Sequence, residues 1–155
     1  MTQTKFACEL AVATDAARAA GAIVRRWYEG NYTVRDKAHD SPVTEADIEA
    51  NQCIHTAIRA AFPADGWLSE ETRDSAERLG KTRVWIIDPL DGTKEFINHI
   101  PEFCVCIGLV EYGVPVLGVE YNPVREELFA GASGGGVTLN GRPVHASAQH
   151  DLAAA

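Results

Sequence analysis

The chain has 155 residues, enough for one domain with a buried core, and its 22 acidic residues outnumber 14 basic ones to give a net charge of −8. This balance argues against a polynucleotide partner, although bound cations can still bring a phosphate group to an acidic protein. No stretch approaches the ~20 apolar residues of a transmembrane segment, and no apolar signal-peptide core follows residues 1–5, so we expect a cytoplasmic protein.

Two helices are predicted in the first part of the chain. Apolar residues at helical spacing predict a helix over residues 6–28 and a second helix that begins at Thr44 and ends before Pro63. Residues 32–34 are typical of a short strand, and the polar residues 36–42 are typical of a turn.

Short strands follow the two helices. We expect strands over residues 67–69 and 84–87, a loop or short exposed helix over 72–81, and one or two helical turns over 92–98. The pattern predicts an α+β fold, with two N-terminal helices packed on a mostly antiparallel sheet whose last strand leaves an uncovered edge. The remaining strands are expected as hairpins: residues 103–110 with 114–120 and residues 127–130 with 136–139, before a turn at 140–142 and Val144.

The cysteines and histidines do not predict a metal site or a disulfide framework. Cys8, Cys53, Cys104 and Cys106 form no C-x-x-C pair, and we expect them to be small buried apolar residues. Cys104, Val105 and Cys106 should alternate between the two faces of a strand. The spacing of the five histidines is unlike that of a transition-metal site.

Acidic residues cluster at three predicted element boundaries, and one cluster lies in the turn after the strand at 84–87. Asp88 and Asp91 are three residues apart, so their carboxylates can face one point with the Leu90 carbonyl between them. Hard oxygen ligands of this kind suit Mg²⁺. Gly92 permits close backbone approach, and Thr93 lies at a predicted helix start, where N–H groups favour a phosphate.

Each cluster has a simpler explanation when it is considered alone. Asp-Pro followed by Asp-Gly is ordinary turn composition, residues 44–47 resemble a helix-capping box, and Glu70 with Glu71 could be a solvated pair. The order of Asp47, Glu70–Glu71 and Asp88–Asp91 along the chain favours a shared metal site.

Three motifs resemble the signatures of the inositol monophosphatase superfamily, which comprises Mg²⁺-dependent, lithium-sensitive phosphatases. They are Ser41-Pro-Val-Thr-Glu-Ala-Asp47, Leu68-Ser-Glu-Glu71 and Trp85-Ile-Ile-Asp-Pro-Leu-Asp-Gly-Thr-Lys-Glu-Phe-Ile97. Within the superfamily, the second motif and Thr93-Lys-Glu-Phe-Ile97 resemble the CysQ branch of 3'(2'),5'-bisphosphate nucleotidases, because inositol phosphatases more often have Thr-x-Asn-Phe there. Gly118-Val-Glu-Tyr-Asn-Pro123 is similar to a further family strand.

The resemblance implies the N-terminal part of the sugar-phosphatase (αβαβα-type) fold, with a metal-binding phosphatase domain over residues 1–147 and a tail over 148–155. It also implies two or three Mg²⁺ ions and inhibition by Li⁺. The implied roles are metal binding by Glu70, Asp88, the Leu90 carbonyl and Asp91, catalysis by Asp47, Glu70 and Thr93, phosphate binding by Asp91, Gly92 and Thr93, and a supporting position for Glu71 behind the ligands.

The implied activity is hydrolysis of 3'-phosphoadenosine 5'-phosphate (PAP) to AMP and phosphate, as in sulfur assimilation. The resemblance also implies a homodimer. Two alternatives stay open: an inositol-phosphate phosphatase, and a non-catalytic remnant that binds Mg²⁺ or phosphate. The family's second half carries Trp-Asp-x-Ala-Ala-Gly, whereas the three tryptophans here precede Tyr28, Leu68 and Ile86. We therefore expect that the C-terminal domain is absent, and that this chain alone has weakened metal affinity and little turnover.

Overall fold

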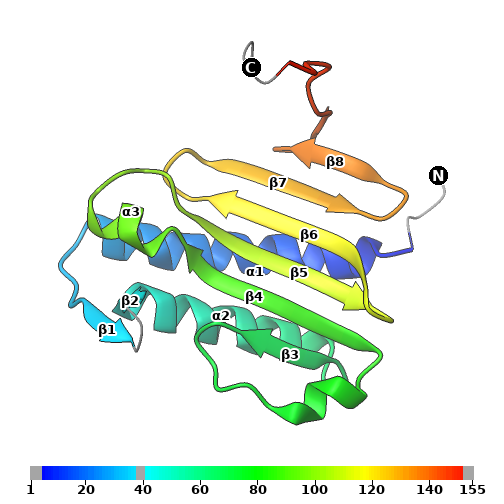
Figure 1. Cartoon of the computed structure of the whole chain (residues 1–155), viewed down its shortest axis with the longest axis horizontal. Coiled ribbons are helices and arrows are strands. Elements are labelled where there is room, and N and C mark those ends of the chain that lie inside the picture. Colours follow the sequence, from blue (N-terminus) through cyan, green and yellow to red (C-terminus); the bar gives the residue numbers. More distant parts are fainter. Residues whose placement is uncertain (1–4, 38–40, 152–155) are drawn as a thin grey trace.

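Two long helices cover one face of a seven-stranded sheet in the computed structural model of the chain, which describes residues 5–37 and 41–151 (Figure 1). The helices are α1 (Ala7–Tyr28) and α2 (Glu45–Ala61), close to the predicted ranges. None of the described helices has the length and apolar character that crossing a bilayer requires.

The long helix α1 approaches the sheet closely because its buried stripe consists of small residues. A side chain at Gly21 would collide with the Tyr121 ring, since an added Cβ would lie 2.5 Å from two ring carbons. Small side chains at this interface exclude water while keeping the helix axis near the strands. The buried residues of the stripe are Ala13, Ala16, Ala17, Ala20, Gly21 and Val24.

The sheet has the order β3-β4-β5-β6-β7-β8-β9, and only its first pair is parallel. All later neighbours are antiparallel, which confirms the predicted α+β class and both predicted hairpins. Strand β9 is the last in this order, as expected for an edge strand. The strands are β3 (Gly66–Ser69), β4 (Arg83–Asp91), β5 (Cys104–Glu111), β6 (Val114–Asn122), β7 (Glu127–Ala132), β8 (Gly136–Leu139) and β9 (Arg142–Val144).

The two faces of the sheet differ in what covers them. Along β5, Val105, Ile107 and Leu109 are buried beneath the helices, whereas Cys104 and Cys106 lie on the opposite face. That opposite face holds a wide, shallow depression of about 840 Å³. Among the described residues, α1 and α2 lie on the first face only, so the second face is open (Figure 1).

Three expectations about local structure need correction or completion. Residues 32–34 are not a strand, because Tyr32 instead packs its ring 4.9 Å from that of Phe96. The strand there is β1 (Arg35–Lys37), which pairs antiparallel with β2 (Ser41–Val43) in the segment predicted as a turn. Residues 38–40 between them, and residues 152–155 of the predicted tail, lie outside the described residues. The charged segment 72–81 contains a short 3-10 helix, η1 (Ala76–Gly80).

Strand β4 continues past the predicted turn at Asp88. It reaches Asp91, but three steps on β4, from Asp88 to Asp91, match two steps on β5, from Cys106 to Cys104. This mismatch is a β-bulge between Asp88 and Asp91, a stretch that contains Pro89, which has no N–H to donate to the ladder. The helical turn predicted over residues 92–98 is α3 (Thr93–Ile97).

Candidate metal and phosphate site

The parallel pairing of β3 with β4 brings two predicted ligands together. Ser69 lies opposite Ile87, and the Glu70 N–H donates to the Ile87 carbonyl at 3.3 Å. Glu70 directly follows β3, and Asp88 is the residue of β4 after Ile87, so the two lie side by side at the edge of the sheet where β3 ends. A site supplied by both residues therefore lies at this edge.

The start of α2 brings a third carboxylate, Asp47, to the same place. Thr44 donates to Asp47 Oδ2 from its N–H at 2.8 Å and from its hydroxyl at 2.6 Å, which confirms the capping box. The other oxygen, Asp47 Oδ1, lies 3.4 Å from Thr93 Oγ1. The cap therefore does not exclude a role in the site, because it uses one oxygen and directs the other towards Thr93.

The bulged end of β4 is held by its own polar contacts. The Leu90 N–H donates to Asp88 Oδ1 at 3.1 Å, and the Thr93 hydroxyl donates to the Leu90 carbonyl at 3.0 Å. Gly92 has φ +88°, and a Cβ there would lie 2.8 Å from the Glu102 carbonyl oxygen. Glycine is therefore required where the chain enters α3.

The electrostatics of this edge favour a cation. Burial raises the pKa of Asp88 from 3.8 to about 7, with further contributions from Glu70, Asp91 and, least, Asp47, while the Leu90 N–H opposes the rise. Neighbouring carboxylates that raise the pKa of Asp88 form a donor set that a divalent cation neutralises, and their hard oxygens fit Mg²⁺.

The cysteines are not the buried apolar residues that the sequence predicted. Cys8 is exposed and the other three are half-buried; all four are free thiols. In the described part of the chain, the one group of three metal-ligating side chains whose ligand atoms all lie within 4.8 Å of one another is Asp91, Cys104 and Cys106. A hydrogen bond between the two thiols, together with burial, raises the pKa of Cys104.

Sequence reasoning missed this group for a structural reason. Cys104 and Cys106 are brought opposite Asp91 and Asp88 only by the pairing of β5 with β4. Residues 92–103 separate the two strands, so no tight turn fixes their register in a way the sequence would show. The alternation of Cys104 and Cys106 around an apolar residue was the available signal.

Clustered carboxylates, a hydroxyl and a bulged turn at one sheet edge form the kind of oxygen donor set that suits a divalent metal ion. Comparison with known proteins gives the family. A sequence profile of the inositol monophosphatase family matches residues 7–155. The chain therefore belongs to the inositol monophosphatase family.

Individual relatives agree with the profile. The inositol monophosphatase of Mesembryanthemum crystallinum is 39% identical over 145 residues, covering 92% of this chain and 54% of that protein. The 3'(2'),5'-bisphosphate nucleotidase CysQ of Escherichia coli strain K12 is 44% identical over 121 residues, covering 76% and 49%. The structure of the extragenic suppressor protein suhB from Bartonella henselae matches with a TM-score of 0.87 at 35% identity, covering 92% and 55%.

These relatives define the family and not the substrate. The chain spans about half the length of the curated relatives it matches. Inositol monophosphatases and bisphosphate nucleotidases are both present among them, and the family consists of metal-dependent phosphatases. Family membership therefore supports a phosphatase site, and the choice of phosphate ester is a matter for experiment.

Proposed function

We propose that this chain forms the metal- and phosphate-binding part of a Mg²⁺-dependent phosphomonoesterase. The observation that supports the proposal best is the convergence of Asp47, Glu70 and Asp88, which come from α2, the end of β3 and the end of β4. Three elements that are far apart in sequence bring carboxylates to one sheet edge, where their charges raise the pKa of Asp88.

The ligands would be oxygen atoms of the bulged turn and its neighbours. Glu70, Asp88 and the Leu90 carbonyl would hold one Mg²⁺, and Asp91 would share a second ion with Asp88. When bound, Mg²⁺ supplies charge neutralisation at a phosphoryl group and polarises its oxygens.

The chain's own residues would position the reactants around these ions. The Thr93 hydroxyl, held by the Leu90 carbonyl at 3.0 Å and near Asp47 Oδ1, would orient an attacking water. The N–H groups of Gly92 and Thr93 would receive the phosphate, and the φ of +88° at Gly92 allows the backbone itself to approach it.

Loss of Mg²⁺ binding in the Asp88→Asn variant tests the metal assignment. We expect isothermal calorimetry to show an affinity for Mg²⁺ at least about 100-fold weaker than in the unsubstituted chain, because a neutral amide replaces the central carboxylate. Asp74→Asn is the matched control, since Asp74 is exposed and pairs with Arg78 instead. An unchanged Mg²⁺ titration in Asp88→Asn, with native circular dichroism, would show that the ligand assignment is wrong.

For the substrate we propose a 3'(2'),5'-bisphosphate nucleotide such as PAP. The Leu68–Glu71 and Thr93–Ile97 motifs support it, as does the 44% identity to the Escherichia coli nucleotidase. Phosphate release from PAP with Mg²⁺, measured against release from inositol 1-phosphate at equal concentration in a relative that carries the same two motifs and the family's second half, is expected to favour PAP by at least about tenfold in kcat/KM.

An inositol phosphate is the second candidate. The longer match to the inositol monophosphatase of Mesembryanthemum crystallinum, 145 residues against 121, favours it. A preference for inositol 1-phosphate in the same assay would replace the nucleotide proposal. Binding of Mg²⁺ and phosphate by calorimetry with no release from either ester would instead support a non-catalytic binding role.

A further inference from the structure

Two thiols on the open face of the sheet lie beside the candidate Mg²⁺ site. Cys104 and Cys106 flank the buried Val105, so both point away from the helices, and their sulfur atoms are 3.5 Å apart. Asp91 lies opposite Cys104 across the β4–β5 ladder. The three ligand atoms all lie within 4.8 Å of one another.

This spacing suits chelation of a metal ion by both thiolates. A tetrahedral site with zinc–sulfur distances of about 2.3 Å places its two sulfur atoms about 3.8 Å apart. A disulfide fits less well, because two residues along one strand have Cα atoms about 6.7 Å apart, near the upper limit for that bond. The geometry of the pair therefore suits metal binding better than disulfide formation.

The surroundings of the thiols admit a cation and attract it. A hollow of about 310 Å³ opens beside Asp91 and Cys104. Glu120, exposed on β6 opposite Cys106, offers a further oxygen. Carboxylates outnumber cationic side chains among the residues that line this hollow. Asp91, Glu102, Glu120 and Glu127 supply carboxylates, and Arg125 is the single cation.

We propose that Cys104, Cys106 and Asp91 form a binding site for a thiophilic divalent cation of the zinc and cadmium type. Binding replaces the two thiol protons, which pass to solvent, and a water or Glu120 completes a tetrahedral ligand set. Mg²⁺ does not compete for the sulfur atoms, because it takes hard oxygen ligands.

Sharing of Asp91 gives the site a consequence that rests on the proposed function. Asp91 is one of the residues we propose as a Mg²⁺ ligand, and two divalent cations held close together by one carboxylate repel each other. A zinc or cadmium ion on the two thiols would therefore weaken Mg²⁺ binding next to it. The site would make this phosphatase part sensitive to thiophilic metals.

Cadmium titration of the fully reduced chain tests the site without any assay of activity. Thiolate–cadmium bonds produce an ultraviolet charge-transfer band, so the expected result is a band that saturates at one Cd²⁺ per chain. Cys104→Ser and Cys106→Ser should each weaken Cd²⁺ binding by on the order of 100-fold. Cys53→Ser is the control, since this half-buried thiol lies on α2, and it should leave the titration unchanged.

Two further results separate this site from the proposed function. Cys104→Ser should keep its Mg²⁺ titration, whereas Asp91→Asn should weaken Cd²⁺ binding by about tenfold and retain the thiolate band. A Cys104→Ser/Cys106→Ser double variant with native circular dichroism and an undiminished band would overturn the site. Failure of Mg²⁺ to bind, with the cadmium results as expected, would overturn only the proposed function.

Discussion

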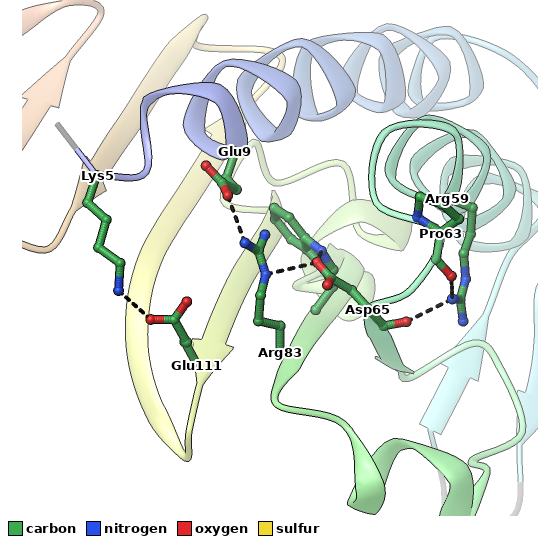
Figure 2. A network of polar contacts seen from close by, with 8 residues as sticks. Lys5, Glu9, Arg59, Pro63, Asp65, Arg83 and Glu111 are labelled. Carbon is green, nitrogen blue, oxygen red and sulfur yellow. Dashed lines mark hydrogen bonds and ion pairs between the residues drawn. The ribbon is translucent and has the colours of Figure 1, made fainter. Parts of the chain in front are cut away.

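The two ends of β4 carry carboxylate groups in opposite electrostatic conditions. At its start, Arg83 lies between Glu9, at 2.8 Å, and Asp65, at 3.2 Å, as Figure 2 shows. At its other end, roughly 17 Å along the strand, Asp88 faces the carboxylates of Glu70 and Asp91. In the first group a guanidinium lies between two carboxylates, whereas in the second group burial and neighbouring carboxylates raise the pKa of Asp88.

The residues around Arg83, at the start of β4, connect several elements of the fold. Trp85 donates its indole N–H to Asp65 at 2.9 Å, and Arg59 donates to the Asp65 carbonyl at 2.8 Å. The Arg83 guanidinium also lies 5.4 Å from the centre of the Phe62 ring. These contacts join α1, the loop after α2, and β4, and Lys5 with Glu111 extends them to the end of β5 (Figure 2). The contacts at this end of β4 therefore stabilise the fold, whereas the carboxylates at the other, acidic end are those we propose as cation ligands.

The largest expected effect on stability comes from removing the Arg83 guanidinium at the start of β4. Arg83→Met should lower the free energy of unfolding by about 3 kcal/mol, because it removes the guanidinium that pairs with two mostly buried carboxylates. Urea unfolding measures the change, and Mg²⁺ affinity should be unaltered. Arg78→Met is the control: its pair with Asp74 is more exposed, and the loss there should be below about 0.5 kcal/mol. Equal losses in both variants would remove the distinction between the two ends.

A smaller loss is expected from the backbone of the acidic end. Gly92→Ala should destabilise the chain by about 2 kcal/mol, because φ is +88° and the new Cβ would meet the Glu102 carbonyl oxygen at 2.8 Å. Gly113 has a similar φ of +78° but open space around it, so Gly113→Ala measures the cost of the backbone conformation alone. It should lower the free energy of unfolding by only about 1 kcal/mol, and the difference from Gly92→Ala is then the cost of the steric contact. Thermal unfolding compares the two variants. Identical losses would mean that Gly92 is required for its φ alone.

The smallest effect has the opposite sign and concerns pH. The pKa of Asp88 rises from 3.8 to about 7 on folding, so the folded chain keeps a proton that the unfolded chain releases in this window. Stability should therefore fall as pH rises from about 4 to about 7 and become level above it. In EDTA at pH 8, Asp88→Asn should be more stable than the unsubstituted chain by about 1 kcal/mol, a value kept small because solvent reaches the group.

The difference between the two urea-derived pH profiles is the readout, because groups distant from Asp88 contribute equally to both profiles. Parallel profiles between pH 4 and 7 would show that Asp88 does not carry the acidic end's repulsion. Excess Mg²⁺ should reverse the order, since it stabilises only the chain that retains its central carboxylate.

Features determined by local pattern could be predicted from the sequence. The helical spacing of apolar residues gave α1 and α2, Thr44 and Asp47 gave a capping box, and the hairpins followed their turns. Features determined by pairing could not be predicted. Strand β1 consists of Arg35, Asp36 and Lys37, which have no strand-like pattern, and its partner strand alone makes it one.

The candidate site divides in the same way. Its acidic residues were predicted because each stands at an element boundary, and the resemblance supplied the roles that we propose for them. The position of the cysteines beside Asp91 depends on a bulge and a ladder register, and the network around Arg83 depends on three elements meeting. Neither the position of the cysteines nor the Arg83 network produces a periodic pattern in the sequence.

The register of β5 limits how the length of this protein can vary among relatives. Val105 faces the core while Cys104 and Cys106 face the open side, so one alternation sets both the core and the site. Inserting or deleting one residue within β5 would move the thiols into the core and Val105 to the surface. A length change at the Tyr112-Gly113 tip would leave both faces intact. We therefore expect insertions and deletions between related genes to collect at that tip and to be absent from β5.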